Sequence, residues 1–164
     1  MKKTSFLLLL VLISTLSFSS CFYLIPWTFK KDYSELPANE SAIVVFTSAR
    51  PATMKVRKWN DQDIYKTLYG PLSSEDENDK AQLTVPPGDN IFTFDISFKY
   101  GDDYYEARNT EIRYNLDPGT KYIVKARINT IKSKGAATKR EFFVGIYPDV
   151  KKSEPLKEWR LGES

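Results

Sequence analysis

Few side chains in this chain are of the types that carry acid–base or metal chemistry. The sequence contains no histidine and a single cysteine, Cys21, so the usual near-neutral general base and the commonest metal ligand are missing. Carboxylates remain, since a pair of Asp or Glu side chains can hydrolyse a glycosidic bond. Asp95, Glu106 and Glu111 fall on or beside expected strands, but no spacing selects a pair among them. We therefore expect a non-catalytic protein with no cofactor and no metal.

Aromatic side chains near turns are the candidate binding residues. Trp59 lies at an expected hairpin tip beside polar turn residues, and Tyr100, Tyr104 and Tyr105 cluster near another turn. Aromatic rings in loops suit sugar or peptide binding, because they supply contact area at a low cost in conformational entropy. The alternative is that Trp59 caps the end of the folded body and that the tyrosines pack as strand neighbours.

Charged side chains form two local clusters without a strong overall field. Lys132, Lys134, Lys139 and Arg140 flank an expected hairpin tip, where they could meet anionic lipid headgroups or simply be solvated. Residues 72–80 (LSSEDENDK) are acidic, but they lack the glycine and distal glutamate of a calcium-binding EF-hand loop. Lys and Arg total 24 against 21 Asp and Glu. This near balance gives no reason to expect a nucleic-acid partner.

The first 21 residues have the pattern of an export signal. Lys2 and Lys3 provide a positive start, and residues 6–16 form an apolar run of signal-peptide length. Small residues then lead to Cys21 in the sequence Ser-Phe-Ser-Ser-Cys. This segment resembles the bacterial lipobox, although Phe18 stands where the common pattern has Leu. The resemblance implies a diacylglycerol on Cys21, and two or more acyl chains anchor a protein stably in a membrane.

Two alternatives for this segment stay open. It could be an ordinary signal peptide that leaves a secreted soluble protein. It could also be an uncleaved anchor, since apolar residues continue past Cys21 and a spanning helix needs about 20 mostly apolar residues. Phe22, Tyr23, Leu24 and Trp27 follow the cysteine. They could sit at the headgroup level, where aromatic rings are favoured, or form an edge strand that packs on the folded domain.

The rest of the chain shows the period-two alternation of β-strands. Residues 91–99 place Phe92, Phe94, Ile96 and Phe98 on one face, with polar residues between them, which predicts a strand over a core. Similar patterns predict strands at residues 42–47, 53–59, 64–69, 81–85, 109–116, 121–131 and 139–147. Gly, Pro, Asn and Asp punctuate the intervals between them. We expect seven or eight antiparallel strands in a β-sandwich.

Two segments share a strand, a Pro-Gly turn and a second strand: residues 83–94 (LTVPPGDNIFTF) and 114–125 (YNLDPGTKYIVK). In these features the chain resembles PEGA-type and related lipoprotein sandwich domains of bacteria, over about residues 42–147. The resemblance implies an immunoglobulin-like antiparallel sandwich at an envelope surface, and it carries over no catalytic residue.

These observations predict a chain with four parts: a signal peptide (1–20), a lipid anchor and tether (21–41), a β-sandwich domain (42–148) and a C-terminal tail (149–164) that is loose or holds a short helix. We expect a protein of the bacterial cell envelope, attached to the inner or outer membrane through Cys21, with its domain outside the cytoplasm. The expected role is a binding or accessory module for an envelope protein or glycan. A purely structural lipoprotein and a carboxylate-based hydrolase are the alternatives.

Overall fold

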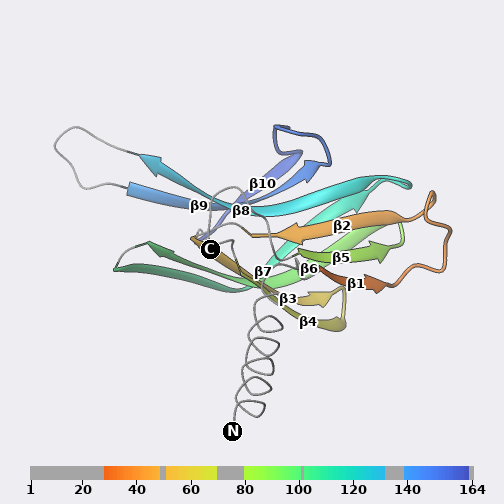
Figure 1. The fold of residues 1–164 in the computed structure, drawn as a ribbon, viewed down its shortest axis with the longest axis horizontal. Coiled ribbons are helices and arrows are strands. Elements are labelled where there is room, and N and C mark those ends of the chain that lie inside the picture. The colour runs from red at the N-terminus through yellow and green to blue at the C-terminus, as the bar shows by residue number, and fades with distance from the viewer. Residues whose placement is uncertain (1–27, 49–50, 70–79, 101, 132–138, 163–164) are drawn as a thin grey trace, which may run out of the picture.

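The computed structural model describes residues 28–48, 51–69, 80–100, 102–131 and 139–162. Within these residues, ten strands make up two sheets, which Figure 1 shows as two stacked layers. The strands are β1 (Thr28–Asp32), β2 (Ala42–Thr47), β3 (Ala52–Trp59), β4 (Gln62–Tyr69), β5 (Lys80–Val85), β6 (Gly88–Tyr100), β7 (Asp103–Leu116), β8 (Lys121–Ile131), β9 (Lys139–Pro148) and β10 (Lys157–Arg160). The expected all-β sandwich is confirmed.

The larger sheet has six strands in the order β1-β5-β2-β8-β9-β10. It is mixed, because β1 pairs with β5 and β2 pairs with β8 in parallel, while its other pairs are antiparallel. The expectation of seven or eight strands, all antiparallel, is therefore wrong in both respects. Each parallel pair joins strands that are distant in the sequence, since parallel neighbours cannot be linked by a short hairpin.

The smaller sheet has four antiparallel strands in the order β4-β3-β6-β7. Its β6 carries the alternation that the sequence predicted, with Phe92, Phe94, Ile96 and Phe98 at most 2% exposed. Burying one such side chain stabilises the fold by about 1.5–3 kcal/mol. These side chains fill the space between the layers together with residues from the larger sheet, among them Phe46, Leu83, Tyr122, Val124 and Ile146.

Both Pro-Gly turns cross from one sheet to the other. The first joins β5 of the larger sheet to β6 of the smaller one, and the second joins β7 to β8. Gly119 in the second turn has a φ of +67°, and a Cβ built on it would lie 2.7 Å from the backbone oxygen of Asn39. Its N–H donates to the carbonyl oxygen of Ser41 at 2.9 Å. Glycine is required here both by the left-handed backbone and by this close approach.

The predicted tether and tail both contribute strands to the larger sheet. The expectation of a tether up to residue 41 is wrong for Thr28–Asp32, which forms β1 at one edge of the sheet. The short helix weighed for the tail is also wrong, because Lys157–Arg160 forms β10 at the opposite edge. The strand pairing thus extends beyond residues 42–148 at both ends of the predicted domain.

Candidate functional site

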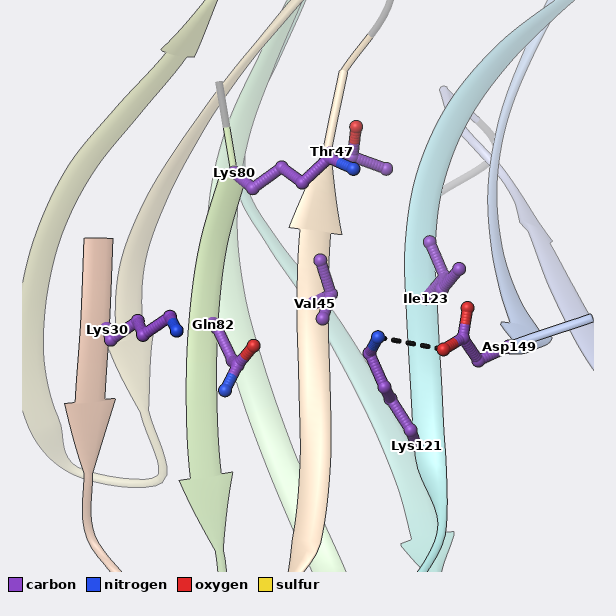
Figure 2. Close-up of a pocket in the computed structure, with 8 residues that line it drawn as sticks. All are labelled: Lys30, Val45, Thr47, Lys80, Gln82, Lys121, Ile123 and Asp149. Atoms are coloured by element: carbon purple, nitrogen blue, oxygen red, sulfur yellow. Dashed lines mark ion pairs between the residues drawn. The ribbon is translucent and has the colours of Figure 1, made fainter. Parts of the chain in front are cut away.

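A pocket lies on the outer face of the six-stranded sheet, on the side away from the core. It has a volume of about 260 Å³ and takes residues from β1, β5, β2 and β8 and from the turn after β9. Figure 2 shows the lining side chains: Lys30, Val45, Thr47, Lys80, Gln82, Lys121, Ile123 and Asp149.

The strand register brings these side chains together. Lys30 pairs with Gln82, Gln82 with Val45, and Val45 with Ile123. Side chains at paired positions point to the same face, so these four form one row across four strands. Neighbouring strands lie about 4.8 Å apart, so the row is about 14 Å long.

The floor of the pocket is unusually well covered for the outer face of a sheet. Val45 and Thr47 alternate with the core residues Val44 and Phe46, so they point outward, yet they are only 6% and 2% exposed. The long side chains that line the pocket surround them, and lysine stems readily cover apolar surface in this way. The result is a partly apolar floor, which Ile123 extends across to β8.

The hydroxyl of Thr47 is buried without a partner. Within the part of the chain that the structure describes, its Oγ1 atom makes no hydrogen bond. Leaving a buried polar group unsatisfied costs about 1–3 kcal/mol. A buried polar group without a partner is rare in a folded protein, and here it belongs to a residue that lines the pocket.

The charges around the pocket are mainly positive. Among the described residues, three lysines line it and one carboxylate, that of Asp149, which lies 2.8 Å from the Nζ atom of Lys121. Both side chains of this ion pair are exposed by about two-fifths, at 44% and 42%. Lys30 has no ion pair among the described residues. The pocket therefore offers ammonium groups, an amide and a hydroxyl, which is a set suited to holding an anionic group.

Trp59 does not form an exposed binding platform, which corrects the expectation for this residue. Its side chain is 7% exposed, and its Nε1–H donates to the Oδ1 atom of Asn90 at 2.7 Å. A β-bulge between Val56 and Lys58 shifts the register by one residue. A one-residue shift turns the following side chains to the other face, so Trp59 points into the core.

The tyrosines near the β6–β7 turn do not form one cluster. Tyr104 is 63% exposed, whereas Tyr105 stacks on Phe142 of the larger sheet with ring centroids 4.1 Å apart. Adjacent residues on a strand point to opposite faces, so the two rings cannot make a joint platform. Burial raises the pKa of the Tyr105 hydroxyl. The side chain of Tyr100 lies outside the described part of the structure.

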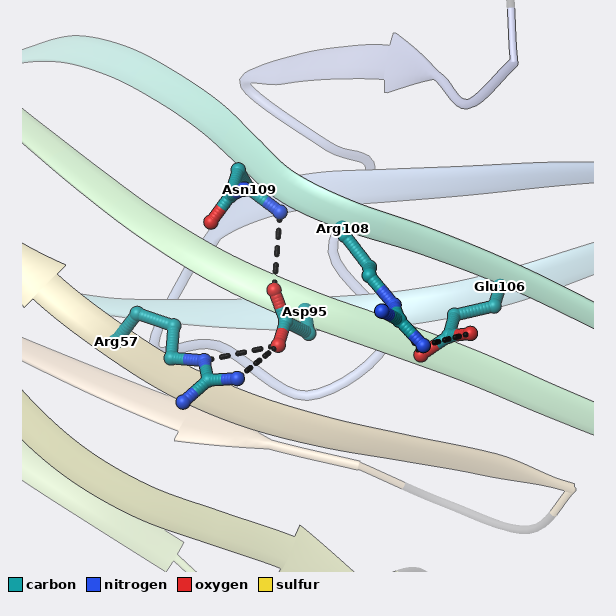
Figure 3. Close-up of polar contacts among 5 residues, drawn as sticks. All are labelled: Arg57, Asp95, Glu106, Arg108 and Asn109. Atoms are coloured by element: carbon teal, nitrogen blue, oxygen red, sulfur yellow. Dashed lines mark hydrogen bonds and ion pairs between the residues drawn. The ribbon is translucent and has the colours of Figure 1, made fainter.

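Two of the three candidate catalytic carboxylates, Asp95 and Glu106, are held by neighbouring groups, and the third, Glu111, is exposed on β7. Asp95 accepts hydrogen bonds from Arg57 Nε at 2.8 Å and from the backbone N–H of Asn109 at 2.9 Å, as Figure 3 shows. Partial burial acts to raise the pKa of the Asp95 carboxyl, but these two donors outweigh it and hold the pKa below its usual value. Glu106 pairs instead with Arg108.

Asp95 also fastens a local irregularity in the smaller sheet. The β6–β7 register shifts between Phe94 and Ile96, and Asn109 opposite has a φ of +50°. Asparagine tolerates this left-handed conformation better than most residues. The carboxylate thus closes the bulge by binding the one backbone N–H that the shift turns toward it, which is a structural task.

Several other predicted features lie wholly or partly outside the described residues. These are Cys21 with the leader and the apolar strip after it, the acidic loop up to residue 79, and Lys132 and Lys134 of the basic hairpin. Of the remaining two basic residues, Lys139 pairs with Glu141 at 3.3 Å.

The sequence reading missed the pocket itself. Its lysines come from β1, β5 and β8, which are far apart in the chain. In the sequence, each of these lysines has the pattern of an ordinary solvent-exposed residue on a strand. One local signal was present: residues 42–47 (AIVVFT) are apolar at positions of both faces, although β2 covers the core with only one of them.

Comparison of the chain with protein-family models, with curated proteins and with solved structures gave no match. Within the described residues, no helix has the length and apolar character that crossing a membrane requires. In the same residues, no three His, Cys, Asp or Glu side chains gather closely enough to hold a metal ion.

Proposed function

We propose that this protein is a lipid-anchored component of the bacterial cell envelope whose β-sandwich is a non-catalytic module that binds an anionic envelope component. The pocket on the outer face of the six-stranded sheet carries this proposal. It combines Lys30, Lys80 and Lys121 with a covered floor and the unpartnered Thr47 hydroxyl. Solubility alone does not require that cationic side chains from several strands gather around one covered floor.

Support for the anchor comes from the leader and from Cys21 at its end. The lipobox resemblance and the PEGA-like turns agree with an envelope location, and the sandwich fold is compatible with that family resemblance. The fixed position of Asp95 between Arg57 and Asn109 favours binding over carboxylate hydrolysis. A purely structural lipoprotein is the alternative that the experiment has to separate.

Native mass spectrometry of the full-length protein, extracted from membranes in a mild uncharged detergent, tests the binding role. We expect an envelope component to remain bound to the wild-type chain and to be lost from Lys30→Gln/Lys121→Gln. The matched control is Arg113→Gln, an exposed residue of β7 in the other sheet, which should retain the component. Identical spectra for all three proteins would favour the purely structural role.

The anchor has a separate test. Mass spectrometry of the mature protein should find Cys21 as the N-terminal residue with the added mass of acyl chains. A Cys21→Ala variant should leave the membrane fraction, because it lacks the lipid and a cleaved leader no longer holds the chain in the membrane. A mature chain that begins at Met1 with an unmodified cysteine would contradict lipidation.

A further inference from the structure

We infer that the pocket on the six-stranded sheet binds the phosphate group of an anionic phospholipid headgroup in the membrane that carries the anchor. This inference rests on the proposed binding function and names its ligand. Four features of the pocket and its surroundings lead to it: the kind of cation, the placement of the cations, the buried floor, and the distance from Cys21.

The cations of the pocket favour a tetrahedral oxyanion over a planar carboxylate. All three are lysines, and no arginine of the described residues lines the pocket. A carboxylate is best matched by the planar fork of arginine, whereas lysine binds phosphate as a compact point charge. The ammonium groups of Lys30 and Lys121 lie on opposite sides of Gln82 and Val45 in Figure 2. Donors that approach from several directions suit an anion whose oxygens also point in several directions.

The floor and rim fit the part of a headgroup next to the phosphate. Val45 and Ile123 offer apolar surface to the CH groups of glycerol, and the Gln82 amide offers hydrogen bonds. The buried hydroxyl without a partner belongs to Thr47, which also lines the pocket. The carboxylate of Asp149 can accept hydrogen bonds that the glycerol hydroxyls donate. Its ion pair with Lys121 weakens the repulsion between this carboxylate and a bound anion. A pocket of about 260 Å³ accommodates more than a bare phosphate ion.

The chain between the anchor and the sheet ends beside the pocket. Thr28, the first residue of β1, pairs with Lys80, and Lys30 follows two residues later. Cys21 precedes Thr28 by seven residues, and an extended chain spans at most about 3.6 Å per residue. A lipid on Cys21 therefore holds this edge of the sheet within about 25 Å of the bilayer surface. This reach allows the lysines to come within a Debye length, about 8 Å, of an anionic leaflet, where its headgroups attract them.

The test uses the full-length, isotope-labelled protein in an uncharged detergent, titrated with short-chain dihexanoyl phosphatidylglycerol. The readout is the backbone amide resonances of Val45 and Ile123, which line the pocket floor. We expect saturable shifts there. Lys30→Gln and Lys121→Gln should each weaken binding about tenfold, since a hydrogen bond to a charged group contributes that much. Arg113→Gln should leave the affinity unchanged within about twofold, because distant surface charges are screened.

Thr47→Val examines the hydroxyl by itself. It should weaken lipid binding while leaving the chain folded, since valine has nearly the same shape as threonine. The indole N–H resonance of Trp59, buried against Asn90, reports that each variant retains the native core. An affinity unchanged by Thr47→Val and by both lysine variants would overturn the assignment of the pocket.

Three soluble probes distinguish the ligand's source and chemistry: glycerol 3-phosphate, inorganic phosphate and glutarate. Tighter binding of the lipid than of glycerol 3-phosphate supports a membrane ligand, whereas equal affinity would overturn the lipid source and leave a soluble phosphate ester. Binding of glutarate alone would overturn phosphate recognition while leaving the proposed binding function intact. If neither the lipid nor any soluble probe binds, the inference fails, and the native mass spectrum decides the proposed function independently.

Discussion

The outer faces of the two sheets use their charged side chains differently. On the four-stranded sheet, Arg57 binds Asp95 and Arg108 binds Glu106, so both of these carboxylates have a cationic partner. On the six-stranded sheet, the pocket gathers three lysines around a single carboxylate and a buried hydroxyl that has no partner among the described residues. The group around Asp95 is thus paired within the fold, whereas the pocket contains a hydroxyl that has no partner in the described fold.

The difference separates interactions that stabilise the fold from groups that are available for binding. A charge that is paired within the fold stabilises the native state, while a donor left without a partner lowers stability and gains its value only on binding. Substitutions on the four-stranded face should therefore affect mainly folding, and substitutions in the pocket should affect mainly binding. Four measurements can break or sharpen that distinction.

The largest expected effect is the loss of Asp95. Asp95→Ala removes the acceptor for both Arg57 and the backbone N–H of Asn109. We expect the free energy of unfolding to fall by about 2 kcal/mol, because hydrogen bonds to charged groups contribute about 1.5–3 kcal/mol. Denaturant unfolding measures this. The control is Glu111→Ala, an exposed position on β7, which should change stability by less than about 0.5 kcal/mol.

Acid should reveal the same interaction. The donors around Asp95 hold its folded-state pKa below the ordinary value, which is about 3.9 in an unfolded chain. The stabilisation is thus complete above that value and is lost as the pH falls through the lower folded-state pKa. Asp95→Asn should have a flatter decline in stability than the wild type below about pH 4. Parallel acid profiles for the two proteins would contradict the role given to this carboxylate.

Removing the Thr47 hydroxyl should change stability in the opposite direction. Thr47→Val removes a buried polar atom that has no partner in the described fold, so the ligand-free protein should become more stable by about 1 kcal/mol. Thr53→Val makes the same change on the outer face of β3 and corrects for the general preference of valine for strands. If thermal unfolding shows the same gain in stability for both variants, the buried Thr47 hydroxyl does not destabilise the fold.

The smallest effect on stability is expected at the pocket lysines. Lys121 and Asp149 form an exposed ion pair, and such pairs contribute about 0–1 kcal/mol. Lys30→Gln and Lys121→Gln should therefore unfold within about 1 kcal/mol of the wild type even though ligand binding is impaired. A large loss of stability would mean that the lysines serve the fold, as Asp95 does.

Local patterns predicted the central strands well and the edges poorly. In β6 four alternating apolar residues are buried, and in β8 two are buried and two more pack against the core, so the period of two is visible in the sequence. The edge strands β1 and β10 are five and four residues long and largely polar, so no alternation marks them. Their pairing depends on partners elsewhere in the chain, which a local pattern does not contain.

The candidate site was harder to predict for related reasons. Trp59 next to a turn suggested an exposed ring, but a single bulge after Val56 turned it inward, and a bulge has no clear mark in this segment. The pocket depends on the parallel pairing of β2 with β8 and of β1 with β5. Because both Pro-Gly turns lead into the other sheet, the sequence neighbours of each strand gave no guide to these pairs.

The parallel pairing of β2 with β8 also constrains the order of folding. Ile43 lies opposite Lys121, and Thr47 lies opposite Lys125. Strand β2, which is synthesised early, therefore cannot complete its pairing until β8 has been synthesised. Contacts that close such long loops form slowly, since the entropy of closure is lost before the contact is gained. Until β8 arrives, one edge of the apolar strand β2 stays unpaired and prone to aggregation. The pocket, whose lining includes Ile123 and Asp149 from late in the chain, therefore forms only in the last stage of folding.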